Sequence, residues 1–100
     1  MYNKGNFRGT HPLLVAVTIG YLELVKYLIE HDADVNKARN DGGTILFMAS
    51  QRGYFDIVKF LVKHGADINK EAIDKITPLG AAELYEYQEI AAYLKSKGAQ

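Results

Sequence analysis

The chain has 100 residues, enough for one domain with a modest core, and its 12 basic side chains are balanced by 12 acidic ones. This balance gives no overall attraction to nucleic acid or anionic membranes, and the absence of cysteine excludes disulfides, thiolate zinc sites and cysteine nucleophiles. The first ten residues hold no signal-peptide run, and the longest apolar run, residues 13–17, is far below the roughly 20 residues that cross a bilayer. We therefore expect an intracellular, cytoplasmic protein that binds neither nucleic acid nor membrane.

Helical patterns and short turns alternate from residue 12 onward. The first predicted helix begins at Pro12, because proline suits the first helical position, and ends at Gly20. In the second helix, apolar side chains at i, i+1, i+4 and i+5 form a stripe wide enough to face a core: Leu24, Val25, Leu28 and Ile29. Asp32 follows at the left-handed position that ends such a helix.

This pattern returns at a fixed spacing. Residues 20–29, GYLELVKYLI, recur 33 residues later as residues 53–62, GYFDIVKFLV, and each position keeps its physical character. A more divergent third copy places Tyr87 33 residues after Tyr54. A fixed period of this length is typical of stacked repeats. The sequence therefore predicts a single domain over residues 1–100 with three units, at about 6–38, 39–71 and 72–100.

The repeat resembles the ankyrin repeat. Thr77-Pro78-Leu79, followed by Ala82, is similar to the family signature T-P-L-H-x-A, and residues 65–69, GADIN, are similar to the family's turn. The resemblance covers nearly the whole chain and implies an all-α solenoid of helix-turn-helix units joined by hairpin-like loops. It also implies a non-catalytic protein-interaction module without a cofactor. The histidine of the signature is absent from all three copies, which lowers the expected stability; the residues in its place are Leu14, Phe47 and Gly80.

The two ends of the predicted stack differ. In the third copy Lys95 replaces the apolar Val62 of the second, which predicts a polar C-terminal cap. The first helix has little polar surface, with Leu13, Leu14, Val15, Val17 and Ile19. Three explanations are open: repeats upstream have been removed from a longer protein, residues 1–9 cover this helix, or a partner covers it.

Two sets of side chains invite a chemical interpretation. The histidines at equivalent positions of successive second helices are neighbours along a stack rather than convergent metal ligands: His31 and His64. Together with the lack of a nucleophile arrangement, they predict no catalytic or metal residue. The tyrosines that recur at the repeat period favour packing between units, with a binding role as the alternative: Tyr21, Tyr54 and Tyr87.

Asn36 and Asn69 lie in the turns after the second helices. Each follows Asp-Val or Asp-Ile and stands eight residues after a leucine. This context is similar to sites that an intracellular asparaginyl hydroxylase modifies in ankyrin proteins. Turn hydrogen bonding is the simpler expectation and hydroxylation the alternative.

A partner surface follows from the resemblance, since ankyrin proteins bind through turn tips and the exposed face of each first helix. The corresponding positions are Phe7, Arg8, Thr10, Thr18, Ile19, Asn40, Asp41, Gly43, Gln51, Arg52, Ile73, Asp74, Ile76, Leu84 and Tyr85. Four of them predict an apolar cluster that a partner covers: Ile73, Ile76, Leu84 and Tyr85. The expected partner is another protein. The alternatives are an inhibitory or targeting subunit of an enzyme, and a homo-oligomer that forms through an uncapped N-terminal repeat.

Overall fold

A computed structural model describes residues 12–39 and 42–100, which form six α-helices and one short 3-10 turn. The helices form three consecutive pairs, which we call the first, second and third unit. Their bounds are α1 Pro12–Ile19 and α2 Leu22–Glu30, α3 Ile45–Arg52 and α4 Phe55–Lys63, η2 Ile73–Lys75, and α5 Pro78–Leu84 and α6 Gln88–Ser96.

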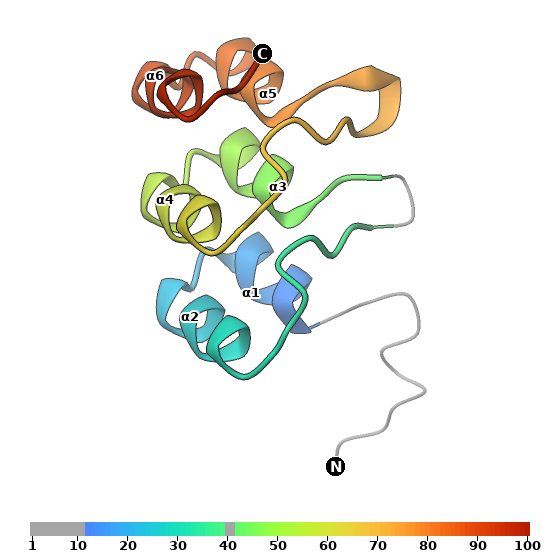
Figure 1. Ribbon diagram of the computed structural model, residues 1–100, viewed down its shortest axis with the longest axis vertical. Helices are drawn as coiled ribbons and strands as arrows, with labels where there is room; N and C mark the ends of the chain where they lie inside the picture. The colour runs from blue at the N-terminus through green and yellow to red at the C-terminus, as the bar shows by residue number, and fades with distance from the viewer. Residues whose placement is uncertain (1–11, 40–41) are drawn as a thin grey trace.

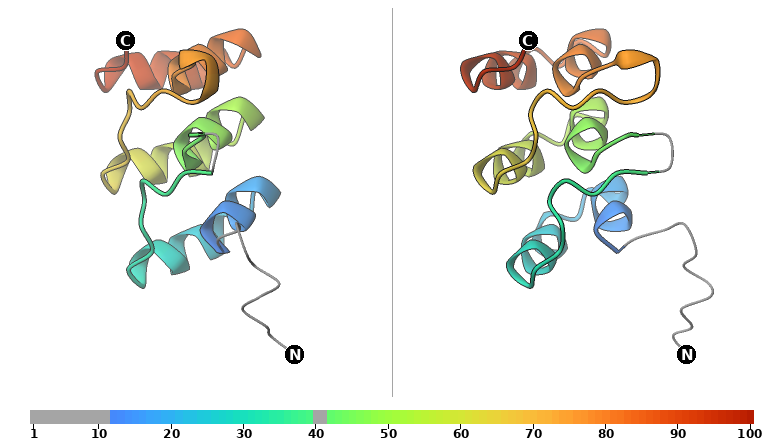
Figure 2. Two further views of the ribbon diagram at one scale, coloured as in Figure 1. Left: turned by 90° about the vertical axis from the view of Figure 1, so that its right-hand side faces the viewer. Right: turned by 45° about the vertical axis from the view of Figure 1, so that its right-hand side comes forward.

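The three units stack on one another along the long axis of the molecule (Figure 1). One row contains α1, α3 and α5, and a second row contains α2, α4 and α6. The loops that join one unit to the next extend to the side of the first row (Figures 1 and 2). This arrangement brings corresponding residues of α1, α3 and α5 into line across the molecule.

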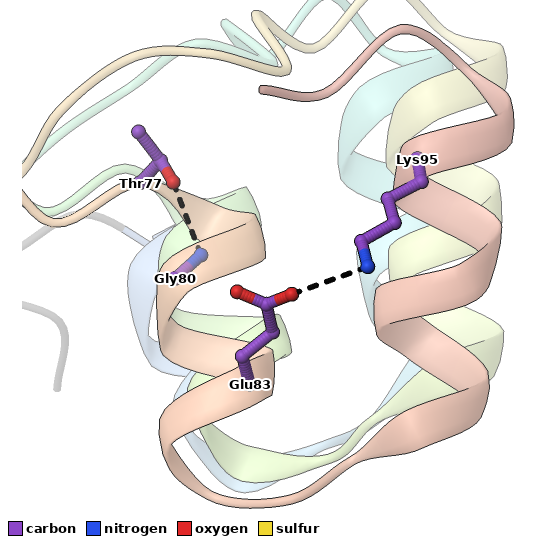
Figure 3. Close-up of polar contacts among 4 residues, drawn as sticks. All are labelled: Thr77, Gly80, Glu83 and Lys95. Atoms are coloured by element: carbon purple, nitrogen blue, oxygen red, sulfur yellow. Dashed lines mark hydrogen bonds and ion pairs between the residues drawn. The ribbon is translucent and has the colours of Figure 1, made fainter.

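The first helices begin where the sequence predicts, at Pro12, Ile45 and Pro78. The hydroxyl oxygen of Thr44 accepts a hydrogen bond of 3.1 Å from the backbone N–H of Phe47. Thr77 caps α5 in the same way, through a 3.0 Å bond from the N–H of Gly80 (Figure 3). Each such cap contributes about 1 kcal/mol to stability.

The joining loops are narrow hairpins. Ala38 and Thr44 form an antiparallel bridge, and the N–H of Arg39 donates to the carbonyl of Gly43 at 2.9 Å. In the next loop the N–H of Ala72 donates to the carbonyl of Ile76 at 2.7 Å. Both loops return the chain to the start of a first helix, which explains the hairpin-like connections that the sequence predicts.

The recurrent tyrosines pack between units, as the sequence favours. A Cβ built on Gly20 would lie 2.8 Å from Cζ of Tyr54, and one built on Gly53 would lie 2.6 Å from Cζ of Tyr87. Both glycines also end a first helix with positive φ, 85° and 78°. Glycine at these positions therefore provides the backbone turn and the space for the ring of the following unit.

The third unit ends the stack with polar side chains. At the positions where the second unit has Ser50, Gly53 and Val62, it carries Glu83, Glu86 and Lys95, all exposed. Lys95 Nζ and Glu83 Oε2 form a 3.4 Å ion pair that joins α6 to α5 (Figure 3). The predicted cap at Lys95 thus has partners on the neighbouring helix that the sequence reading did not include.

The expectation for α1 needs correction, because most of its apolar side chains are covered. Leu13, Leu14 and Val17 are buried, while Val15 and Ile19 are exposed. The buried three belong to the core, since α1 packs against both α2 and α3. The apolar surface left on this helix is therefore limited to particular positions and does not extend around it.

Candidate partner-binding surface

Exposed side chains mark the ends of all three first helices. Ile19 and Arg52 are the last residues of α1 and α3, and Leu84 and Tyr85 stand at the end of α5. The exposed fractions are 66% for Ile19, 64% for Leu84 and 50% for Tyr85. Because α1, α3 and α5 lie side by side (Figure 2), these residues follow one another across the stack. We call Ile19, Arg52, Leu84 and Tyr85 the helix-end row.

The row is apolar at both ends and cationic in the middle. Arg52 is exposed and makes no ion pair or side-chain hydrogen bond with the residues that the structure describes. Its guanidinium carries five N–H donors in a planar fork that matches a carboxylate. The row can therefore receive apolar side chains at two places, separated by a place for an acidic group.

Three other predicted positions offer less to a partner. The hydroxyl of Thr18 donates a 2.8 Å hydrogen bond to the carbonyl of Leu14 within the same helix. Gly43 is buried in the first hairpin, and Gln51 is partly buried. Their place in the fold leaves the helix-end row as the accessible part of the first-helix surface.

The predicted four-residue apolar cluster is not one continuous patch. Ile76 is partly buried and packs against the core just before α5 begins. Leu84 and Tyr85 lie at the other end of this seven-residue helix, a separation of roughly 10 Å at 1.5 Å per residue. Asp74 is exposed with φ of 62°, in the short turn η2.

The remaining predicted contacts lie outside the described residues, or, for Ile73, have a side chain outside them: Phe7, Arg8, Thr10, Asn40, Asp41 and Ile73.

Asn36 and Asn69 link successive units. Asn36 Oδ1 accepts from the N–H of Asp67 at 2.6 Å, and its Nδ2 donates to the carbonyl of Gly65 at 3.5 Å. Asn69 repeats this arrangement on the carbonyl of Gly98 at 3.4 Å and the N–H of Gln100 at 3.0 Å. The predicted turn role thus extends to the next unit. Their hydroxylation stays a prediction.

Both described histidines interact with their own helices. Nδ1 of His31 lies 2.8 Å from the carbonyl oxygen of Tyr27, and the two rings stack at 4.0 Å. His64 and Phe60 show the same pair of contacts, at 2.9 Å and 4.0 Å. No three His, Asp or Glu side chains within residues 12–39 and 42–100 are grouped to hold a metal ion. Among the helices described, none has the length and apolar character to cross a membrane.

Comparison with protein families supports the repeat. The family model described as ankyrin repeats (3 copies) matches residues 1–72. A comparison with curated proteins gives no match. Ankyrin repeats are generally protein–protein interaction modules and typically non-catalytic. The match covers more than half of the chain, and the third helix pair, beyond residue 72, completes the same stack. The chain therefore belongs to the ankyrin repeat family.

Proposed function

We propose that the chain is a non-catalytic binding module that holds another protein along the helix-end row. The observation that carries this proposal is the exposure of Ile19, Leu84 and Tyr85 at equivalent ends of the first helices. Large apolar side chains gathered on one surface are typical of protein-binding sites, where aromatic residues and arginine contribute most to affinity. The general role of ankyrin repeats supports the same conclusion.

The row also suggests the chemistry of the partner. A segment that crosses α1, α3 and α5 meets an apolar side chain, then Arg52, and then the Leu84–Tyr85 pair. We expect a partner that presents a carboxylate between two apolar groups, because a guanidinium fork accepts a carboxylate in bidentate fashion.

The hairpin tips extend this surface, through Asp74 and the predicted contacts outside the described residues. A single domain over residues 1–100 is part of the proposal, and the absence of cysteine fits a reducing intracellular setting.

A pull-down from lysate of the source cells tests the row. We expect Leu84→Ser with Tyr85→Ser to reduce partner recovery at least about tenfold, since loss of two hot-spot side chains costs a few kcal/mol. Both side chains are at least half exposed, so the change leaves the fold intact. Circular dichroism and the unfolding midpoint of the double variant check this point.

Tyr27→Ser is the matched control, because Tyr27 is 55% exposed but lies on the second helix of its unit. It should leave recovery unchanged. Equal recovery by wild type and the Leu84/Tyr85 double variant would contradict the proposal. If the recovered protein is an enzyme whose activity falls on binding, the module acts as an inhibitory subunit.

A further inference from the structure

The first unit exposes apolar side chains at positions that are buried in the other two. Val15 is 41% exposed, whereas Met48 and Ala81, at the same position of α3 and α5, are each 1% exposed. Leu28 is partly exposed, whereas its counterpart Leu61 is fully buried. In the second and third units these positions face the preceding unit. We call this surface of the first unit the N-terminal face: Pro12, Val15, Tyr21, Leu24, Tyr27 and Leu28.

Tyr21 shows what the N-terminal face would contact. Tyr54 and Tyr87 place their rings on Gly20 and Gly53 of the preceding unit, so closely that a Cβ would overlap them. Tyr21 holds the same position in the first unit and is 56% exposed. An occupant that completes the pattern therefore carries a glycine at the end of its own first helix.

The C-terminal end of a second copy does not offer this glycine. Glu86 occupies the position of Gly20 and Gly53, with φ of 63°, and its Cβ would stand where the Tyr21 ring must lie. The neighbouring Glu83–Lys95 ion pair would also lose solvent against an apolar face, which is costly. Head-to-tail stacking of two identical chains is therefore disfavoured.

The repeat register also continues ahead of the first unit. Residues 3–4 are Asn-Lys, as are residues 36–37 and 69–70, at the period of 33. Asn36 and Asn69 bind the turn that follows the next unit along the chain. By register, Asn3 belongs to the closing turn of a unit that precedes α1.

We propose that the N-terminal face binds a further ankyrin repeat, stacked in register ahead of α1, with glycine at the position of Gly20. This contact continues the interface that already joins the three units. The two ends of the stack then have different roles: the N-terminal face receives a repeat, and the polar C-terminal end stops the series. The inference does not depend on the helix-end row.

Fusion of one repeat tests the proposal on the full chain. A copy of residues 34–66 placed directly before Met1 keeps the period of 33 and supplies the counterpart of Gly53. We expect this fusion to raise Tm by about 10 °C or more, because each added interface stabilises a repeat stack. Glu in place of that glycine should abolish the rise. A copy of residues 35–67 placed after Gln100 should raise Tm far less, since Glu86 blocks the contact.

Tyr21→Ala separates the possible occupants. It should shift Tm by less than about 3 °C in the original chain but by about 5 °C or more in the N-terminal fusion. A large loss in the original chain would mean that residues 1–11 already cover the face, which overturns the proposal. An unchanged Tm on fusion would also overturn it, as would a dimer in sedimentation that Val15→Asp dissociates, because the occupant would then be a second copy.

Discussion

Gly53→Ala is expected to destabilise the chain by about 3 kcal/mol or more, a large part of the 5–15 kcal/mol typical of small proteins. Two effects combine. An alanine held at the φ of 78° costs roughly 1–2 kcal/mol. Its Cβ would also stand 2.6 Å from Cζ of Tyr87, so the ring must leave its place between the second and third units, at a further cost of about 1–3 kcal/mol.

Gly65→Ala is the matched control, because Gly65 has φ of 93° but no atom within 4 Å of the added Cβ. Urea unfolding followed by circular dichroism should show only the backbone cost for this variant, about 1–2 kcal/mol. Tyr87→Ala introduced with Gly53→Ala should cost less than the sum of the two single changes. Equal losses for Gly53→Ala and Gly65→Ala would contradict the tyrosine contact.

Leu61→Ala is expected to cost about 3 kcal/mol, within the usual range of 2–5 kcal/mol for a leucine in a core. Leu61 is fully buried between the second unit and the first. Leu28 occupies the same helix position in the first unit but is only partly buried. Leu28→Ala should therefore cost less than about half as much, because partial burial leaves less apolar area to lose.

Both leucine variants can be measured by the same urea titration, with the m-value checking that the transition stays two-state. If Leu28→Ala and Leu61→Ala cost the same, the N-terminal face is covered in the isolated chain. That result would remove the basis for a further repeat on this face.

The local structure follows closely from the sequence, because the signals for it are local. Thr44 and Thr77 precede first helices and cap them through their hydroxyl oxygens. Gly65 ends a second helix with φ of 93°, and Asp32 does so with φ of 74°, as predicted for the left-handed position. Such features depend on a few neighbouring residues, so the repeat period was enough to locate them.

Contacts between units were harder to predict, because they depend on which face of a helix meets its neighbour. Ile76 looked like surface by analogy with other turn positions, yet it packs on the core. Val17 looked uncovered and is fully buried. The role of Glu86 was also missed, although the spacing of 33 from Gly53 held the signal. It became clear only once the ring of Tyr87 was placed on Gly53.

Site-specific photo-crosslinking tests the binding surface most directly. Benzoylphenylalanine is placed at positions 19, 52 and 85 of the helix-end row, and at the register-matched controls Glu30, Lys63 and Ser96 near the ends of the second helices, which are also exposed. The proposed function predicts that the three row positions crosslink to one and the same protein and that the three control positions do not. Crosslinking of that protein from the control positions, with none from the row, would contradict it.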